Sequence, residues 1–188
     1  MREKSVNARA WMTLNRKCNL RCDWCYAKST NYDNFADMTI DKAYHIIDML
    51  CKLNIHHISL IGGEPTLYCD LINVIEYAKK HNVSCGIITN GIKLANQDFL
   101  SELKNAGLHN VNLSLKGYSR ENFKDSTGFD RYQQSLDAIK NLKNSNIPFS
   151  VSMVINPNNS KYFLSGVSDA IKKGQQIFIY PLNLIFQY

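Results

Sequence analysis

Apolar runs typical of β-strands alternate with amphipathic helical stretches along the 188-residue chain. Six such runs predict strands over residues 10–14, 57–61, 83–89, 110–115, 149–155 and 176–180. Apolar residues at helical spacing predict five helices over residues 40–51, 71–78, 96–106, 131–144 and 161–173. Thr39 and Asp70 are expected to cap the first two helices, and Gly107 to end the third. Strands that alternate with helices predict right-handed βαβ units and a parallel sheet.

Two arrangements satisfy this alternation, an open doubly wound sheet and a partial barrel. Both place chemistry at the C-terminal ends of the strands. The sequence agrees with that placement, because polar or glycine-rich segments follow four of the predicted strands. These segments are residues 15–37, 62–65, 89–91 and 114–117.

Composition indicates one domain over residues 1–188, because 45% of the residues are hydrophobic, enough for a sizeable core. No run of about 18 apolar residues predicts a membrane-spanning helix. Residues 1–10 are polar and lack the apolar core of a signal peptide. We therefore expect a cytoplasmic protein with no membrane partner.

The formal net charge of +6 is compatible with an acidic peptide, a nucleotide or a nucleic acid as partner. Many lysines, however, stand at the ends of predicted helices, where they are solvated and complement the helix dipole. No single basic stripe stands out, so a nucleic-acid partner is not expected.

Three of the six cysteines, Cys18, Cys22 and Cys25, are clustered with the spacing C-x3-C-x2-C. Three thiolates on one loop can hold a [4Fe–4S] cluster, and because such a cluster normally takes four, one iron would stay open to a ligand. A zinc site would need a second cysteine or histidine pair, which the sequence lacks. A disulfide scaffold and three unrelated core thiols both fit a clustered, polar loop poorly.

This loop after a first strand resembles the signature of the radical S-adenosylmethionine (SAM) superfamily. Trp24 occupies the place of the aromatic residue that the family carries before its third cysteine. The resemblance implies an α/β fold with a partial (β/α)6 barrel of parallel strands. It also implies a [4Fe–4S] cluster on the three cysteines, which cleaves SAM reductively to a 5′-deoxyadenosyl radical that abstracts hydrogen from a substrate.

Later strand-end motifs match the family in the same order. Gly62, Gly63 and Glu64 resemble its "GGE" motif, which implies contact with the SAM amino group; an ordinary Gly-Gly turn is the alternative. Ser114 and Lys116 are similar to positions that bind the ribose and the methionine carboxylate; an exposed strand-end lysine is the alternative. The resemblance assigns further, weaker SAM contacts to Thr89, Asn90, Ser152, Val154 and Asn183, for which turn or core roles are equally open.

The other cysteines are expected to be structural. Cys51 lies on the apolar face of a predicted helix and Cys85 lies within a strand, so both are expected in the core. Cys69 precedes a helix N-terminus, where the pKa of a thiol can fall. A reactive role is therefore open for Cys69, although a structural one is favoured.

The segment 18–27 resembles radical SAM enzymes that modify peptides or proteins, often with a C-terminal cysteine-rich domain that this chain lacks. The chain stops just after the sixth strand, which indicates a minimal or truncated member, or a partner that supplies the rest. Members that serve molybdopterin biosynthesis carry a second cysteine triad, which is not found here.

The expected partners are SAM, a reductant such as flavodoxin or ferredoxin, and a peptide or protein substrate. Two alternatives stay open. The stretch Ser-Leu-Lys-Gly at 114–117 is closer to the activases of glycyl-radical enzymes. A non-catalytic electron-transfer or structural iron–sulfur module would use the cysteine loop without SAM.

Overall fold

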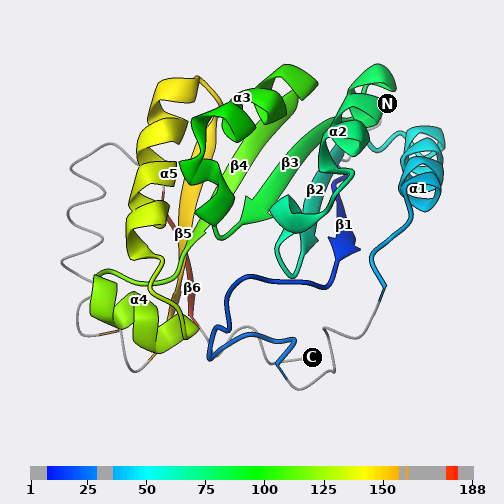
Figure 1. The fold of residues 1–188 in the computed structure, drawn as a ribbon. Helices are drawn as coiled ribbons and strands as arrows, with labels where there is room; N and C mark the ends of the chain where they lie inside the picture. The colour runs from blue at the N-terminus through cyan, green and yellow to red at the C-terminus, as the bar shows by residue number, and fades with distance from the viewer. Residues whose placement is uncertain (1–7, 29–35, 157–159, 161–176, 182–188) are drawn as a thin grey trace, which may run out of the picture.

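A parallel six-stranded sheet organises the chain (Figure 1). The structure is a computed structural model that describes residues 8–28, 36–156, 160 and 177–181. Its strands are β1 (Ala10–Asn15), β2 (His57–Gly62), β3 (Ser84–Thr89), β4 (Leu108–Leu115), β5 (Phe149–Ile155) and β6 (Ile177–Pro181). Their order in the sheet equals their order in the chain, and every neighbouring pair is parallel. Because the order never reverses, the sheet is not doubly wound, and the partial barrel is confirmed.

The helices are α1 (Ile40–Lys52), α2 (Leu71–Lys80), α3 (Gln97–Ala106), α4 (Arg120–Thr127) and α5 (Tyr132–Ser145), with short 3-10 turns η2 (Pro65–Leu67) and η3 (Ile92–Ala95). Thr39 caps α1 as predicted, by accepting from Lys42 N at 3.4 Å. Gly107, at φ 102°, ends α3 in the left-handed conformation that favours glycine. The predicted helix over 161–173 lies outside the described residues.

Asp70 stands at the N-cap position of α2, but the prediction that its side chain caps the helix is wrong. Its backbone (φ −97°, ψ 20°) is not extended, and its side chain makes no bond to a backbone amide of the first turn of α2. The carboxylate instead accepts from two side chains, Asn73 Nδ2 at 3.3 Å and Cys69 Sγ at 3.2 Å. An N-cap side chain reaches the helix amides from extended backbone, which explains the difference.

Helix α4 is the element that the sequence pattern did not predict. Ser119 caps it by accepting from Asn122 N at 3.1 Å, and Gly128, at φ 75°, ends it. Its single buried apolar side chain is Phe123. Without an apolar stripe, its sequence carries no helical period to detect.

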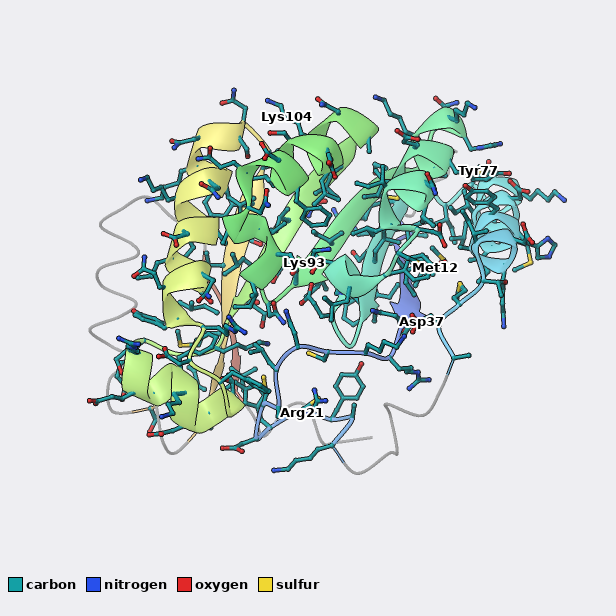
Figure 2. All side chains as sticks on the ribbon, in the orientation of Figure 1. Met12, Arg21, Asp37, Tyr77, Lys93 and Lys104 are labelled. Carbon is teal, nitrogen blue, oxygen red and sulfur yellow. The ribbon has the colours of Figure 1, made fainter. Side chains whose placement is uncertain are left out.

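The two faces of the sheet differ. The outer face is apolar and forms one core with α1, α2, α3 and α5, which lie on that side of the sheet in Figures 1 and 2. Its strand residues are Met12, Leu14, Ile58, Leu60, Cys85, Ile87, Val111, Leu113 and Val151. The alternate residues form what we call the inner face, which is mostly polar. It includes Thr13, His57, Ser59, Ser84, Gly86, Asn110, Asn112, Ser114, Ser150 and Ser152.

Within the described ranges, none of the helices has the length and apolarity needed to cross a membrane.

Candidate cluster and cofactor site

The segment that leads from β1 into the cysteine loop runs against the end of β2. Gly63 N donates to Asn15 O at 3.0 Å, and Glu64 N donates to Lys17 O at 2.8 Å. A Cβ atom on Gly63 would lie 2.3 Å from the carbonyl oxygens of Arg16 and Lys17. Glycine is therefore required here because the chain's own backbone approaches this closely.

Three further hydrogen bonds fix the middle of the cysteine loop. Asn90 Nδ2, just beyond β3, donates to Asn19 Oδ1 at 2.7 Å. Farther along, Arg21 N donates to Thr127 O at 2.9 Å and Asp23 N donates to Ser126 O at 3.0 Å. The last carbonyls of a helix lack partners within the helix, so the end of α4 binds the loop with groups that are otherwise unpaired. Figure 1 shows the loop passing below the strand ends to α4.

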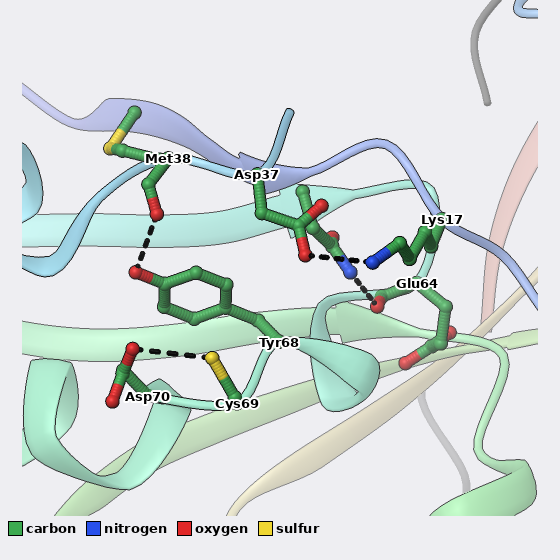
Figure 3. A network of polar contacts seen from close by, with 8 residues as sticks. Lys17, Asp37, Met38, Glu64, Tyr68, Cys69 and Asp70 are labelled. Atoms are coloured by element: carbon green, nitrogen blue, oxygen red, sulfur yellow. Dashed lines mark hydrogen bonds and ion pairs between the residues drawn. The ribbon is translucent and has the colours of Figure 1, made fainter. Parts of the chain in front are cut away.

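A third anchor holds the segment that returns to α1 (Figure 3). Lys17 Nζ lies 3.6 Å from Asp37 Oδ2, and the Tyr68 hydroxyl donates to Met38 O at 2.8 Å. Met38 N also donates to Leu14 O at 2.8 Å. Both ends of the loop are thus tied to the ends of β1 and β2.

The three clustered cysteines are free thiols on this anchored loop. Cys18 and Cys22 are half-buried and Cys25 is exposed, in a turn closed by Cys25 N donating to Cys22 O at 3.0 Å. Burial raises the pKa of Cys18 to about 11. Burial also raises the pKa of Cys22, while the ammonium of Lys116 acts in the opposite direction.

These thiols fit an iron–sulfur cluster by their chemistry. Soft thiolate donors select Fe–S clusters and zinc, and three on one loop leave one cluster position open. Among the described residues, no three His, Cys, Asp or Glu side chains already converge as a metal site does. The thiols lose their protons when they bind a metal, and the positive charge of Lys116 favours that loss.

Glu64 is a buried hub at the end of β2, with 1% of its surface exposed. Its Oε1 accepts from Thr66 N at 3.1 Å, Thr66 Oγ1 at 2.6 Å and Thr89 Oγ1 at 2.6 Å, and its Oε2 accepts from Asn90 N at 2.7 Å. Asn15 Nδ2 donates to the Glu64 carbonyl at 2.9 Å. The carboxylate of Glu64 thus joins the ends of β2 and β3, and its main-chain carbonyl joins the end of β1.

The predicted pair at the end of β4 also comes together. Lys116 Nζ donates to Ser114 Oγ at 2.8 Å. The positive charge of Lys116 acts to lower the pKa of both Cys18 and Cys22. Trp24 lies half-buried on the cysteine loop. A fixed cation therefore stands beside the candidate cluster ligands.

The remaining residues predicted to contact SAM are Ser152, Val154 and Asn183. Ser152, on β5, donates to Asn112 Oδ1 of β4 at 2.7 Å and is 5% exposed. Val154 is half-buried two residues farther along the strand. Asn183 lies outside the described residues.

The other three cysteines lie in different environments. Cys85 is buried in the core, as predicted, and burial raises its pKa to about 12. Cys51 packs, partly buried, against the same core. The possibility of a lowered pKa at Cys69 is wrong, because its thiol donates to the Asp70 carboxylate and this bond raises the pKa.

Sequence reasoning missed the residues that position the loop rather than bind a ligand: Asn15, Asn19, Thr66, Ser126 and Thr127. Helix α4 could have been predicted from its two ends, the capping Ser119 and the terminal Gly128, which enclose eight helical residues. The contacts themselves join residues up to 106 positions apart (Arg21 to Thr127), and no local pattern shows them.

The family model "Radical SAM superfamily" matches residues 12–164, which include most of β1, the cysteine loop and strands β2 to β5. This chain belongs to the radical SAM superfamily. Enzymes of this family use a [4Fe–4S] cluster and SAM, the two cofactors expected from the motif.

Two sequence relatives are named "Probable GTP 3′,8-cyclase". The protein from Pyrococcus abyssi is 31% identical over 144 residues, covering 77% of this chain and 46% of its own length. The protein from Pyrococcus horikoshii is 29% identical over 176 residues, covering 94% of this chain and 53% of its own. This chain therefore spans about half the length of the curated relatives it matches.

Solved structures agree on the fold. The enzyme anSMEcpe with bound AdoMet superposes with a TM-score of 0.76 at 20% identity, over 93% of this chain and 51% of that one. SuiB of Streptococcus suis, bound to its precursor peptide SuiA, gives 0.79 at 17% identity, over 95% and 40%. At such identities the likeness shows the fold alone.

Proposed function

We propose that this chain carries the SAM-cleaving core of a radical enzyme. When bound, the cluster supplies one electron that breaks a C–S bond of SAM, giving methionine and a 5′-deoxyadenosyl radical that abstracts hydrogen from a substrate. The observation that carries the proposal is the anchored loop itself. Its three free thiols lie at the C-terminal strand ends, beside Lys116 and the Glu64 hub.

Cys18, Cys22 and Cys25 are proposed to hold the cluster. Lys116 is suited to pair with the carboxylate of the SAM methionine, because its ammonium is held by Ser114 and its charge acts on Cys18 and Cys22. Glu64 is proposed to act on SAM mainly by positioning. With four bonds accepted by its carboxylate, it fixes the backbone of Thr66 and of Asn90, whose side chain binds the loop.

Ser152 and Val154 are proposed to contact the ribose and adenine, since both lie on the inner face toward the C-terminal end of β5. Trp24, Gly62, Thr89 and Asn183 keep the supporting roles that the family motif implies. A reductant such as flavodoxin or ferredoxin is proposed as the electron donor.

Two substrate classes compete. Peptide or protein modification follows from the local sequence around the cysteines, and two solved structures of the same fold carry peptides. A nucleotide substrate follows from the relatives named GTP 3′,8-cyclases, which share about 30% identity over most of this chain. The second class rests on the higher identity and is the one we favour. A non-catalytic iron–sulfur module is the alternative outside enzymes.

The test is the product of SAM. The protein is reconstituted anaerobically with iron and sulfide, reduced, and given SAM, and 5′-deoxyadenosine is measured by mass spectrometry. We expect 5′-deoxyadenosine from the wild-type protein and a loss of at least tenfold in Lys116→Ala at unchanged iron content. The matched control is Lys104→Ala, an exposed lysine on α3. A reconstituted cluster that yields no 5′-deoxyadenosine contradicts the proposal and supports the non-catalytic module.

A further inference from the structure

The inner face carries a second group of polar side chains, at the N-terminal ends of the strands. Arg9, just before β1, stands next to His57 of β2, because the following residues Ala10 and Ile58 are paired in register. His57 is paired in turn with Ser84 of β3. An irregularity in the β3–β4 register brings in His109, whose ring lies 5.9 Å from that of His57, edge to face.

Hydrogen bonds fix which nitrogen of His57 is free. Ser84 Oγ donates its one proton to His56 O at 3.0 Å, so it accepts from His57 Nδ1, 2.9 Å away. The Nε2 nitrogen of His57 is left for another partner. Burial, the Arg9 charge and His109 lower the pKa of His57, so its ring is uncharged near neutral pH until an anion offsets these effects.

No counter-ion in the described ranges balances this group. None of the six strands contains Asp or Glu. The ion pairs in the described part of the chain involve other residues, so Arg9, His57 and His109 are not neutralised by a carboxylate. Arg9 and His109 are exposed and His57 is half-buried, which leaves the group accessible.

The rest of the inner face suits a polar, uncharged part of a ligand. Asn110 and Asn112 of β4 lie between the two ends, and the buried Oδ1 of Asn110 has no hydrogen-bond partner. Gly86 leaves room for that amide, since a Cβ there would lie 2.5 Å from Asn110 Oδ1. From His57 to Gly62 the six residues of β2 span about 16 Å, at about 3.3 Å per step. A nucleotide-sized molecule can extend over that distance.

We propose that Arg9, His57 and His109 bind the phosphate of a small phosphorylated substrate, which extends along Asn110 and Asn112 toward the SAM end of the sheet. The inference rests on the proposed function, because the reacting carbon has to reach SAM at the opposite end. It favours a phosphate over a basic peptide: strands without carboxylates offer no anionic partner to a basic side chain, and a dianion suits two imidazoles and a guanidinium.

The probe is inorganic tripolyphosphate, titrated calorimetrically into the anaerobically reconstituted protein with SAM present, while the visible absorbance of the cluster is monitored. We expect binding to the wild-type protein, weakened at least tenfold by His57→Gln and by Arg9→Gln. Arg9→Lys should retain more affinity than Arg9→Gln, which excludes misfolding as the cause. The matched control is His45→Gln, an exposed histidine on α1 that should bind as the wild type does.

A second readout is the proton taken up. In two buffers of different ionisation enthalpy, binding near pH 7.5 should take up protons in the wild-type protein, because the phosphate raises the lowered pKa of His57. Arg9, His109 and His56 are the other titratable or charged groups at this position, and His57→Gln should reduce the uptake.

Two results would overturn the assignment. One is absence of tripolyphosphate binding at millimolar concentration; the other is tighter binding of a glutamate-rich peptide, which would indicate a peptide substrate. Failure of the proposed function would be seen in a different measurement, because the wild-type protein would then form no 5′-deoxyadenosine. The two failures can therefore be distinguished.

Discussion

Alternate residues of the same strands lie in two different environments. On β2, Ile58 and Leu60 are completely buried under the helices, whereas the neighbouring His57 and Ser59 face the other way and are only partly buried. On β4, Val111 and Leu113 are buried beside Asn110 and Asn112. The outer face thus supplies hydrophobic stabilisation, about 1.5–3 kcal/mol for each large side chain. The inner face contributes little apolar burial and is available for binding.

The difference also shows how a parallel sheet can have one polar face. Parallel strands buried on both faces are near-continuous apolar runs, but here helices cover one face only. The polar groups of the inner face bond to one another across strands, as Ser152 does with Asn112 and His57 with Ser84. Where a partner is missing, as at Asn110 Oδ1, a ligand can provide it.

The largest effect is expected at the cysteine loop. Cys22→Ala should abolish the reconstituted cluster and all 5′-deoxyadenosine formation, because two thiolates do not hold the cluster in place. Iron and sulfide analysis with mass spectrometry checks this. Cys69→Ala, an exposed cysteine outside the loop, serves as control and should keep both. Full iron content in Cys22→Ala would contradict the assignment of Cys22 as a ligand of the cluster.

A pair of adjacent substitutions tests the comparison of faces directly. Leu60→Ala should lower the free energy of unfolding by about 3 kcal/mol, because it leaves a cavity in the core. Ser59→Ala, one residue earlier on the inner face, should change it by about 0.5 kcal/mol or less. Urea unfolding followed by circular dichroism measures both. Equal losses at the two positions would mean that the inner face is also packed as a core.

Glu64→Gln should produce a smaller loss of stability, about 1–3 kcal/mol. The amide nitrogen of glutamine cannot accept a hydrogen bond, so one of the donors from Thr66, Thr89 or Asn90 loses its partner. The affinity for SAM, measured calorimetrically, should fall as well, while iron content stays unchanged. Glu76→Gln, an exposed glutamate of α2, is the matched control. Loss of the cluster in Glu64→Gln would show that the hub is needed to form the loop at all.

The smallest expected effect is the pH dependence that His57 contributes. Its pKa in the folded protein is lowered, mainly by burial, below the ordinary value of 6.5. The unfolded chain therefore binds more protons, and this contribution to stability is lost as pH falls through about 6.5 toward the folded value. His57→Gln should flatten the stability profile between about pH 7 and 5.5 in urea titrations. His45→Gln should leave the slope as in the wild-type protein.

The sequence predicted the sheet well because strand alternation and helix periodicity are local. It predicted where the cysteine loop, Glu64 and Lys116 lie because C-terminal strand ends meet at one edge. It did not predict α4, which has one buried apolar residue, or the capping failure of Asp70. Nor did it predict that Asn19 and Thr127 hold the loop, since these contacts depend on tertiary structure. The expected peptide substrate is not supported by the sequence relatives, whose name concerns a nucleotide.

The most direct test of the central claim is the EPR spectrum of the reduced, reconstituted protein before and after addition of SAM. If Cys18, Cys22 and Cys25 hold a cluster with one open position beside Lys116, SAM should shift the g-values of the wild-type protein. The same addition should have a much weaker effect in Lys116→Ala. A cluster spectrum that SAM leaves unchanged in the wild-type protein would contradict the account and indicate an iron–sulfur module that does not bind SAM.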